Sequence, residues 1–491
     1  MYGCGATDDG VREIPKVQLP DAFRNSPPAT AKATPPAQGA DANKPTDDKD
    51  ADTKGTQKAP DAATAEAQLN APESKWWQSF HSDELDHLIG IALDNNHDLR
   101  VAVTRIAQAE ETAVINGAAQ YPTLNLTTQW TGSRAEAGLA TGNLGSGYSR
   151  IPMFAFQASY EADLWGKNKY SAESAYALAM ASIHFREGVA LTLASDITKT
   201  YVDYLAESDH VAVAQNNLAN ARKALDSVRI RMEQGDATQV ELLQQETTAS
   251  NAEATVQVHR LNREKAFDKL AALMGTTPSF LTISATTLKG IEPPDLSPGI
   301  PAQLICRRPD IRRAEATMLS ADADIKVARA KMYPDLTFSV SLGRSGYAFS
   351  EWLLPQANYA SLVGGITQAI FSAGKNDATV RQAEAKYEEM VETYRQAIIQ
   401  AVHDVEDALA EIRLTGEQRK ALLKATGHAK QAYEISTFSF DKHAIDFLSL
   451  LESQRSLYTT EDAEVTARAD LLKASVDLFM ALGGGLDAPH C

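Results

Sequence analysis

The sequence lacks several features that identify common protein classes. Its 491 residues include only three cysteines, Cys4, Cys306 and Cys491, too few and too dispersed for a disulfide framework or a zinc site. We expect Cys306 to be a small buried apolar residue. No run of 18 or more apolar residues occurs, so no transmembrane helix is predicted. Positive charge is also scarce, with 47 Lys+Arg against 64 Asp+Glu, so nucleic acid is not an expected partner.

Motifs for covalent chemistry are missing as well. There is no HExxH, GxSxG or P-loop sequence, and the ten histidines are scattered with no Cys/His cluster. We therefore expect a protein that is not an enzyme and that has no cofactor and no metal site.

Proline is concentrated near the N-terminus. Nine of the 20 prolines lie in residues 1–72, and residues 26–75 carry almost no large apolar side chains. Such a composition cannot bury a core, so residues 1–75 are predicted to be an anchor and a low-complexity linker. Cys4 follows a small residue, Gly3, as the lipidated cysteine of a bacterial lipoprotein does. A lipid anchor and an ordinary N-terminal thiol both fit these two residues.

Long proline-free spans predict very long helices. More than 120 residues separate Pro152 from Pro278, and likewise Pro355 from Pro489, and both spans show apolar residues at three- and four-residue steps. A helix from Lys169 to Glu233 would be roughly 100 Å long at about 1.5 Å per residue. That length implies coiled-coil-like packing. A soluble coiled-coil scaffold fits this pattern too.

The chain is internally duplicated. Five pairs of short segments match in order, with offsets of 212 for the first two and 208 for the rest. They are Asp98-Leu99-Arg100 with Asp310-Ile311-Arg312, Tyr121-Pro122 with Tyr333-Pro334, Leu164-Trp165-Gly166 with Ser372-Ala373-Gly374, Val240-Glu241-Leu242-Leu243 with Leu448-Ser449-Leu450-Leu451, and Met274-Gly275 with Leu482-Gly483. We expect a first repeat at 76–290, a second at 291–485, and a tail at 486–491.

Each repeat contains two segments with period-two alternation, which predicts strands at about 121–134, 150–164, 333–344 and 359–371. Each is about ten residues long, enough to cross a bilayer as a tilted strand. Four strands cannot close a membrane barrel, which needs at least about eight. We therefore expect several chains to share one barrel, because closure removes unpaired edges from the lipid. Two exposed hairpins of a soluble sheet are the alternative.

This arrangement resembles the TolC-like outer-membrane factors, especially the lipid-anchored efflux branch of OprM/NodT-type outer-membrane efflux lipoproteins. The resemblance covers roughly residues 76–485. Its words are Trp76-Trp77-Gln78-Ser79-Phe80, Asp83-Glu84-Leu85, Asn95-Asn96-His97-Asp98-Leu99-Arg100, Tyr121-Pro122, Tyr160-Glu161-Ala162-Asp163-Leu164-Trp165-Gly166, Arg307-Arg308-Pro309-Asp310-Ile311 and Leu450-Leu451-Glu452-Ser453-Gln454. It implies a mainly α fold with a β-barrel part: long helices form an α-helical tunnel, and four transmembrane strands per subunit contribute to a trimeric 12-stranded β-barrel.

The resemblance also implies a function. The protein would be the trimeric outer-membrane channel of a tripartite efflux system, in the outer membrane of a Gram-negative bacterium and projecting into the periplasm. Its partners would be two further copies of itself, a periplasmic adaptor, an inner-membrane pump and outer-membrane lipid. The cargo would be drugs or other small toxic compounds, and Cys4 would be the lipid anchor. A type I secretion duct and a soluble coiled-coil scaffold are the alternatives.

Two helix turns are expected to form the periplasmic end. Gly235 is predicted to be a C-cap glycine, with Asp236 and Gln239 forming the capping box of the next helix. The second turn is Lys442-His443-Ala444. The resemblance places a periplasmic gate at Asp446, Ser449 and Glu452, with Asp236 and Glu241 as counterparts in the first repeat. Adaptor contacts are expected at Arg231, Gly235, Lys442 and His443.

Like charges repeated three-fold at Asp446 or Glu452 would raise a carboxylate pKa in a narrow neck. Ordinary helix capping by Asp446 and a solvated helix face at Glu452 are the alternative interpretations.

Overall fold

The structure is a computed structural model that describes residues 75–135, 147–294, 304–345, 354–442 and 444–484. Cys4 and His443 lie outside these residues. The described chain forms two compact units, and each draws on both halves of the sequence. One unit contains Ala102–Arg186 and Pro309–Ile398, and the other contains the described parts of Gln18–Val101, Glu187–Arg308 and Ile399–Cys491.

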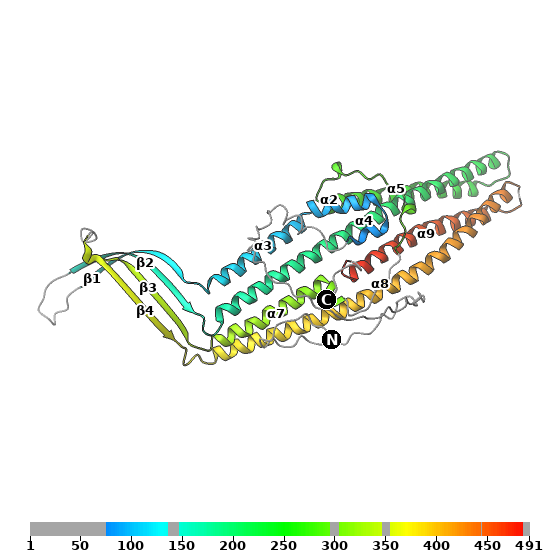
Figure 1. The fold of residues 1–491 in the computed structure, drawn as a ribbon. Helices are drawn as coiled ribbons and strands as arrows, with labels where there is room; N and C mark the ends of the chain where they lie inside the picture. The colour runs from blue at the N-terminus through cyan, green and yellow to red at the C-terminus, as the bar shows by residue number, and fades with distance from the viewer. Residues whose placement is uncertain (1–74, 136–146, 295–303, 346–353, 443, 485–491) are drawn as a thin grey trace, which may run out of the picture. The chain divides into compact units, whose positions relative to one another are not determined.

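The order of elements repeats along the chain, as Figure 1 shows. The first half runs through η1 (Trp76–Phe80), α2 (Asp83–Asn95), α3 (His97–Ala118), β1 (Thr123–Ala135), β2 (Gly147–Ala162), α4 (Lys167–Glu233) and α5 (Gln239–Leu273). The second contains α6 (Leu304–Arg307), α7 (Pro309–Ala330), β3 (Asp335–Ser345), β4 (Asn358–Thr367), α8 (Lys375–Asp441) and α9 (Phe447–Ala481). Short 3-10 turns η2 (Pro278–Phe280), η3 (Leu288–Gly290) and η6 (Pro355–Ala357) join them.

The very long helices predicted from the proline-free spans are confirmed. Helices α4 and α8 have 67 residues each, and α5 and α9 have 35 residues each. Equal lengths in the two halves are what a duplicated chain requires. No described helix combines the length and apolar content needed to cross a membrane.

The first unit contains one antiparallel sheet, in the order β1-β2-β3-β4 (Figure 1). Strand β4 ends at Thr367, four residues before the end expected at 371, in the segment where the alternation is weakest. At the end of the sheet, Trp165 stacks on Tyr333 with ring centroids 4.8 Å apart. The Trp165 indole N–H also donates to the Pro334 carbonyl at 2.9 Å. Segments from two of the duplicated pairs, Leu164-Trp165-Gly166 and Tyr333-Pro334, therefore contact each other.

The second unit holds the main core. Trp76 stacks on Phe479 at 5.0 Å between ring centroids, and Tyr201 and Leu205 are fully buried in the same cluster. This contact joins η1, the first described element, to α9, the last helix.

Two duplicated glycines end α5 and α9 in the same way. Gly275 has φ +67° and Gly483 has φ +80°, a left-handed conformation that favours glycine. A Cβ on Gly275 would lie 2.6 Å from the Asn95 carbonyl oxygen, and one on Gly483 would lie 2.8 Å from that of Arg307. The duplicated segments Met274-Gly275 and Leu482-Gly483 thus make equivalent close contacts, each between the end of a long helix and the backbone of a preceding helix end.

The expectation for Cys306 was wrong. Cys306 is half-buried and disulfide-bonded, and not a buried free thiol.

Candidate functional site: the sheet face and the helix turns

The register of the sheet gathers apolar side chains on one face. Residues paired across antiparallel strands share a face. One row is Leu124, Ala158, Val340 and Leu362, and the next is Leu126, Phe156, Leu342 and Ala360. Leu124 is 71% exposed and Leu362 is 74% exposed. This is a broad apolar surface left open to its surroundings, of the kind that marks an interaction or membrane site.

The opposite face is polar. Asn125, Gln157, Ser341 and Ser361 form one row across all four strands. A sheet that is apolar on one side and polar on the other separates lipid from water when it curves into a wall.

The outer strands, β1 and β4, each pair with only one neighbour among the described residues. Their remaining edges therefore carry backbone donors and acceptors available to other strands. Lipid cannot satisfy such groups, so a sheet of this kind needs edge partners in a membrane.

The first helix turn differs from the predicted capping. Gly235 has φ +82°, and the Asp236 N–H donates to the Arg231 carbonyl at 2.8 Å, so the predicted C-cap glycine is confirmed. Thr238, not Asp236, is the N-cap of α5. Its hydroxyl accepts from the Glu241 N–H at 3.3 Å, and its N–H donates to the Glu241 carboxylate at 2.7 Å. The turn is two residues longer than predicted, because the Asp236 N–H takes part in the Schellman-type hydrogen bonds that end α4.

The second turn repeats this geometry at an offset of 208. The Ala444 N–H donates to the Ser439 carbonyl at 2.8 Å, matching the bond between Asp236 and Arg231. Asp446 takes the N-cap position of Thr238, and its carboxylate accepts from the Ser449 N–H at 2.9 Å. Hydrogen bonds from the Ser449 side chain and backbone lower the pKa of Asp446 below its usual value, because they stabilise the charged form.

The two turns are held together by a cluster that we call the tip cluster. It consists of Val228 on α4, Phe440 on α8, and Phe447 and Leu450 on α9, all nearly fully buried. The Arg231 guanidinium lies over the Phe440 ring at 4.4 Å from its centroid. Its Nε and Nη1 atoms are buried without a hydrogen-bond partner among the described residues. A cation–π contact is thus the main interaction of this side chain.

Comparison with known proteins places the chain in a family. The model of the outer membrane efflux protein family matches residues 88–276 and 300–484. The chain belongs to this family. It is 33% identical over 434 residues to the pyoverdine export outer membrane protein OpmQ of Pseudomonas putida, covering 88% of this chain and 91% of OpmQ.

Solved structures agree. A membrane protein from Pseudomonas aeruginosa is 27% identical, with a TM-score of 0.78 over 84% of this chain and 93% of that chain. The open state of the Neisseria gonorrhoeae MtrE outer membrane channel is 25% identical, with a TM-score of 0.78 over 96% of this chain and 97% of that chain. The predicted TolC-like family, its tunnel-and-barrel fold class and the role of an outer-membrane efflux channel are confirmed.

The structure brings together only some of the predicted residues of this efflux protein. Asp446 and Ser449 are in direct contact, whereas Glu452 is exposed one turn further along α9. Asp236 is exposed in the first turn, and the Glu241 carboxylate is engaged in the capping box.

Among the predicted tip residues, Gly235 and Lys442 are exposed, and the Lys442 ammonium lies 5.8 Å from the centroid of the Phe438 ring. Arg231 is drawn into the tip cluster, as described above. No described contact joins the acidic residues of one turn to those of the other.

Sequence reasoning missed four exposed apolar residues beside the turns. Ile230 and Phe438 precede the two turns at an offset of 208, and Val240 and Leu448 follow them at the same offset. Each is more than half exposed, from 56% for Ile230 to 66% for Phe438. The duplication could have revealed these residues, because an apolar residue recurs at the equivalent helix end in both repeats.

Proposed function

We propose that this chain is the outer-membrane duct of a tripartite efflux system, in which three copies form the channel and dock onto a periplasmic adaptor and an inner-membrane pump. The observation that carries the proposal is the exposed apolar face of an open four-stranded sheet. Three such sheets joined edge to edge give a closed wall with lipid outside and water inside. A soluble coiled-coil scaffold would leave this face in water, and nothing in the described residues favours a type I secretion duct.

The proposed cargo is small molecules, such as drugs or other toxic compounds. OpmQ is named for export of pyoverdine, and this supports export of small molecules over export of proteins. We propose no cofactor and no catalytic residue, since a duct acts through the width and charge of its pore.

The same proposal assigns the parts of the chain. Residues 1–75 would be an anchor and linker with lipid on Cys4, residues 76–290 and 291–485 the two repeats, and 486–491 a tail. Mass spectrometry of the mature protein tests the anchor, because acylation at Cys4 adds a mass that a Cys4→Ser variant lacks. An unmodified Cys4 in the membrane-extracted protein would contradict it.

At the helix turns, we propose an acidic gate at Asp446, Ser449 and Glu452, with Asp236 and Glu241 as its counterparts in the first repeat. Support comes from Asp446 and Glu452, which are exposed at the start of α9 and therefore available to line a shared pore. Ser449 keeps Asp446 charged in the single chain, which opposes the pKa rise that three close copies would cause. A ring of carboxylates in a narrow neck attracts cations.

Single-channel conductance in planar bilayers tests both the duct and the gate. Wild-type trimer should conduct and prefer cations, and D446N/E452Q should conduct more and discriminate less, because the acidic ring is neutralised. The matched control is E110Q/E388Q, which removes two exposed carboxylates that are distant from both turns in the sequence. Absence of any channel would reject the duct. Equal conductance and cation preference in D446N/E452Q and the control would reject only the gate.

For the adaptor, we propose a docking surface formed by Gly235, Lys442 and His443 together with the exposed apolar residues beside the turns. Ile230, Val240, Phe438 and Leu448 supply apolar area, and Lys442 supplies charge. Arg231 would act indirectly, by fixing Phe440 inside the tip cluster.

A further inference from the structure

Two histidines that are far apart in the sequence lie together in the second unit. His210 on α4 and His259 on α5 stack with ring centroids 4.8 Å apart and an interplanar angle of 10°. Asp462 on α9 accepts from the Nδ1 of His210, with 2.7 Å between Nδ1 and Oδ1. The same Oδ1 lies 3.9 Å from the Nε2 of His259. One ring nitrogen of each histidine and one carboxylate oxygen therefore face a common point.

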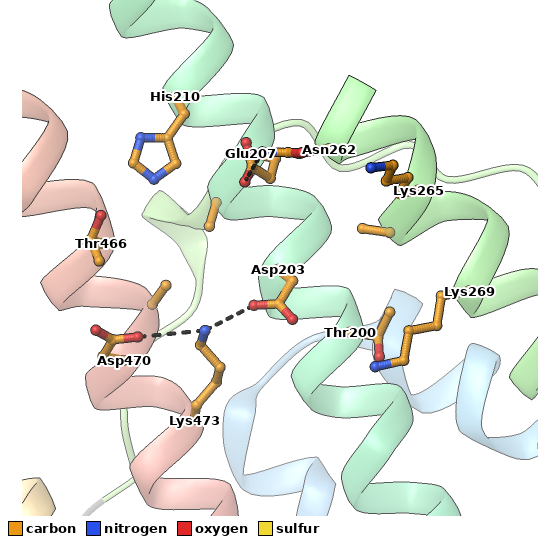
Figure 2. A pocket seen from close by; sticks show the side chains of 13 residues that line it. Thr200, Asp203, Glu207, His210, Asn262, Lys265, Lys269, Thr466, Asp470 and Lys473 are labelled. Carbon is orange, nitrogen blue, oxygen red and sulfur yellow. Dashed lines mark hydrogen bonds and ion pairs between the residues drawn. The ribbon is translucent and has the colours of Figure 1, made fainter. Parts of the chain in front are cut away.

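A further carboxylate orients one of these ligands. Glu207 accepts from the Nδ1 of His259 at 2.8 Å, and the Asn262 amide donates to the other Glu207 oxygen at 3.3 Å. Figure 2 shows the pair Glu207 and Asn262 beside His210 at one end of a cavity of about 420 Å³. Because an ionised carboxylate only accepts, His259 carries its hydrogen on Nδ1 and presents the lone pair of Nε2. Carboxylates hold metal-binding histidines in this way.

We propose that His210, His259 and Asp462 form a binding site for a divalent transition-metal ion of the zinc class. Zinc takes imidazole nitrogen and carboxylate oxygen at about 2.0–2.2 Å, so tetrahedral ligands lie about 3.3–3.4 Å apart. The separations of 2.7 and 3.9 Å bracket that value. The three donor atoms all lie within 4.8 Å of one another, so shifts of the side chains, with the His210 hydrogen moving from Nδ1 to Nε2, would place them around one ion and leave the fourth position open to water.

The charge around the site suits a cation. Asp462 and Glu207 place one carboxylate within hydrogen-bond distance of each imidazole. The nearby Lys473 is already held between Asp203 at 2.9 Å and Asp470 at 3.4 Å, as Figure 2 shows. The histidines are shielded from water, with side chains 9% and 16% exposed. One carboxylate and two imidazole nitrogens would therefore bind the ion, with Glu207 holding His259 in place.

The site would connect the two halves of the duplicated chain. His210 and His259 belong to the first half and Asp462 to the second, and none has a counterpart at the offset of 208. A bound ion would hold α4, α5 and α9 at fixed distances, well away in sequence from the turns at 235 and 443. It would thus act as a structural clamp on the helices and not as transported cargo.

Metal uptake by tag-free, detergent-solubilised trimer tests the site. Equilibrium dialysis against Zn²⁺ should give one ion per chain, and Co²⁺ should give the absorption spectrum of tetrahedral coordination. H210A, H259A and D462N should each lose at least about tenfold in affinity, and E207Q about 10- to 100-fold. The matched control is H428A, which removes an exposed histidine of α8 and should bind as the wild type does.

Each variant is first checked for wild-type circular dichroism and trimer formation, and D462N keeps the size of the side chain it replaces. Zn²⁺ should also raise the unfolding temperature of wild type and H428A but not of H210A, since an ion bound only to the folded state stabilises it. No uptake by the wild type at micromolar Zn²⁺, or equal uptake by H210A, H259A and D462N, would overturn the site. Neither result affects the proposal that the chain is a duct.

Discussion

At the scale of the residue, Glu84 shows how one carboxylate can join three segments. It accepts from the Tyr201 hydroxyl at 2.8 Å, from the Ser284 N–H at 2.6 Å and from the Ala285 N–H at 3.1 Å. Burial opposes ionisation of Glu84, but these hydrogen bonds outweigh it and hold its pKa below the usual 4.5. A folded-state pKa below the unfolded one gives stability that is present above about pH 4.5 and is lost as pH falls through the folded pKa.

Glu84→Gln should therefore destabilise the protein by about 1–2 kcal/mol at pH 7, a figure reduced for solvent screening. The difference from wild type should shrink toward acid pH, because the wild type then also loses its charged acceptor. Urea unfolding at pH 7 and near pH 3 measures it, with the exposed Glu388→Gln as control. A destabilisation that is the same at both pH values would show that Glu84 acts through packing alone.

At the scale of the element, the start of α5 depends on one residue that sequence reasoning passed over. The segment Asp236-Ala237-Thr238-Gln239 offers two capping candidates, and both are common N-caps. Asp236 is a favourable residue type for an N-cap, but its N–H donates to the Arg231 carbonyl at the end of α4. Asp236 therefore belongs to the end of α4 and not to the start of α5. Glu241, three residues after Thr238, completes the capping box.

Thr238→Ala should cost about 1 kcal/mol of local stability, because the Glu241 N–H loses its acceptor. Hydrogen exchange at the first turn of α5 should become about fivefold faster, as that free energy implies. Thr247→Ala is the control, since its hydroxyl only bonds back to Leu243 within the helix. Equal exchange in the two variants would mean that the tip cluster, and not the cap, holds the turn.

At the scale of the whole molecule, the register of the sheet decides which side faces lipid. Ser341 and Leu342 are neighbours on β3 and point to opposite faces, with Ser341 in the polar row and Leu342 in the apolar one. The side chain of Leu342 is 55% exposed. The two positions therefore form a matched pair on an inner strand.

Leu342→Arg should reduce the yield of outer-membrane trimer strongly, because Arg on the lipid face costs about 2–4 kcal/mol at mid-bilayer depth. Ser341→Arg should still form trimer and should change conductance, since its side chain would point into the channel. Membrane fractionation and gel migration with and without heating measure the trimer. Comparable loss in both variants would contradict the assignment of the two faces.

Prediction from sequence succeeded where one local pattern was sufficient. Periodicity and missing proline placed α4 within two residues at its start, because a helix of that length needs every residue to tolerate the same backbone. It did not anticipate that the Arg231 guanidinium lies over the ring of Phe440, which is 209 residues away in the chain. It also treated His210 and His259 as scattered, since no spacing in the sequence relates them to Asp462.

By itself, the sequence determined the duplication, the long helices, the alternating strands and the position of both turns, since these depend on residues near one another along the chain. Only the tertiary structure decided which residue caps each turn, which side chains form the tip cluster, and which histidines meet a carboxylate. The physical reason is that a side chain's contacts depend on the register between packed helices and paired strands. That register is set by the fit of whole surfaces and not by any single segment.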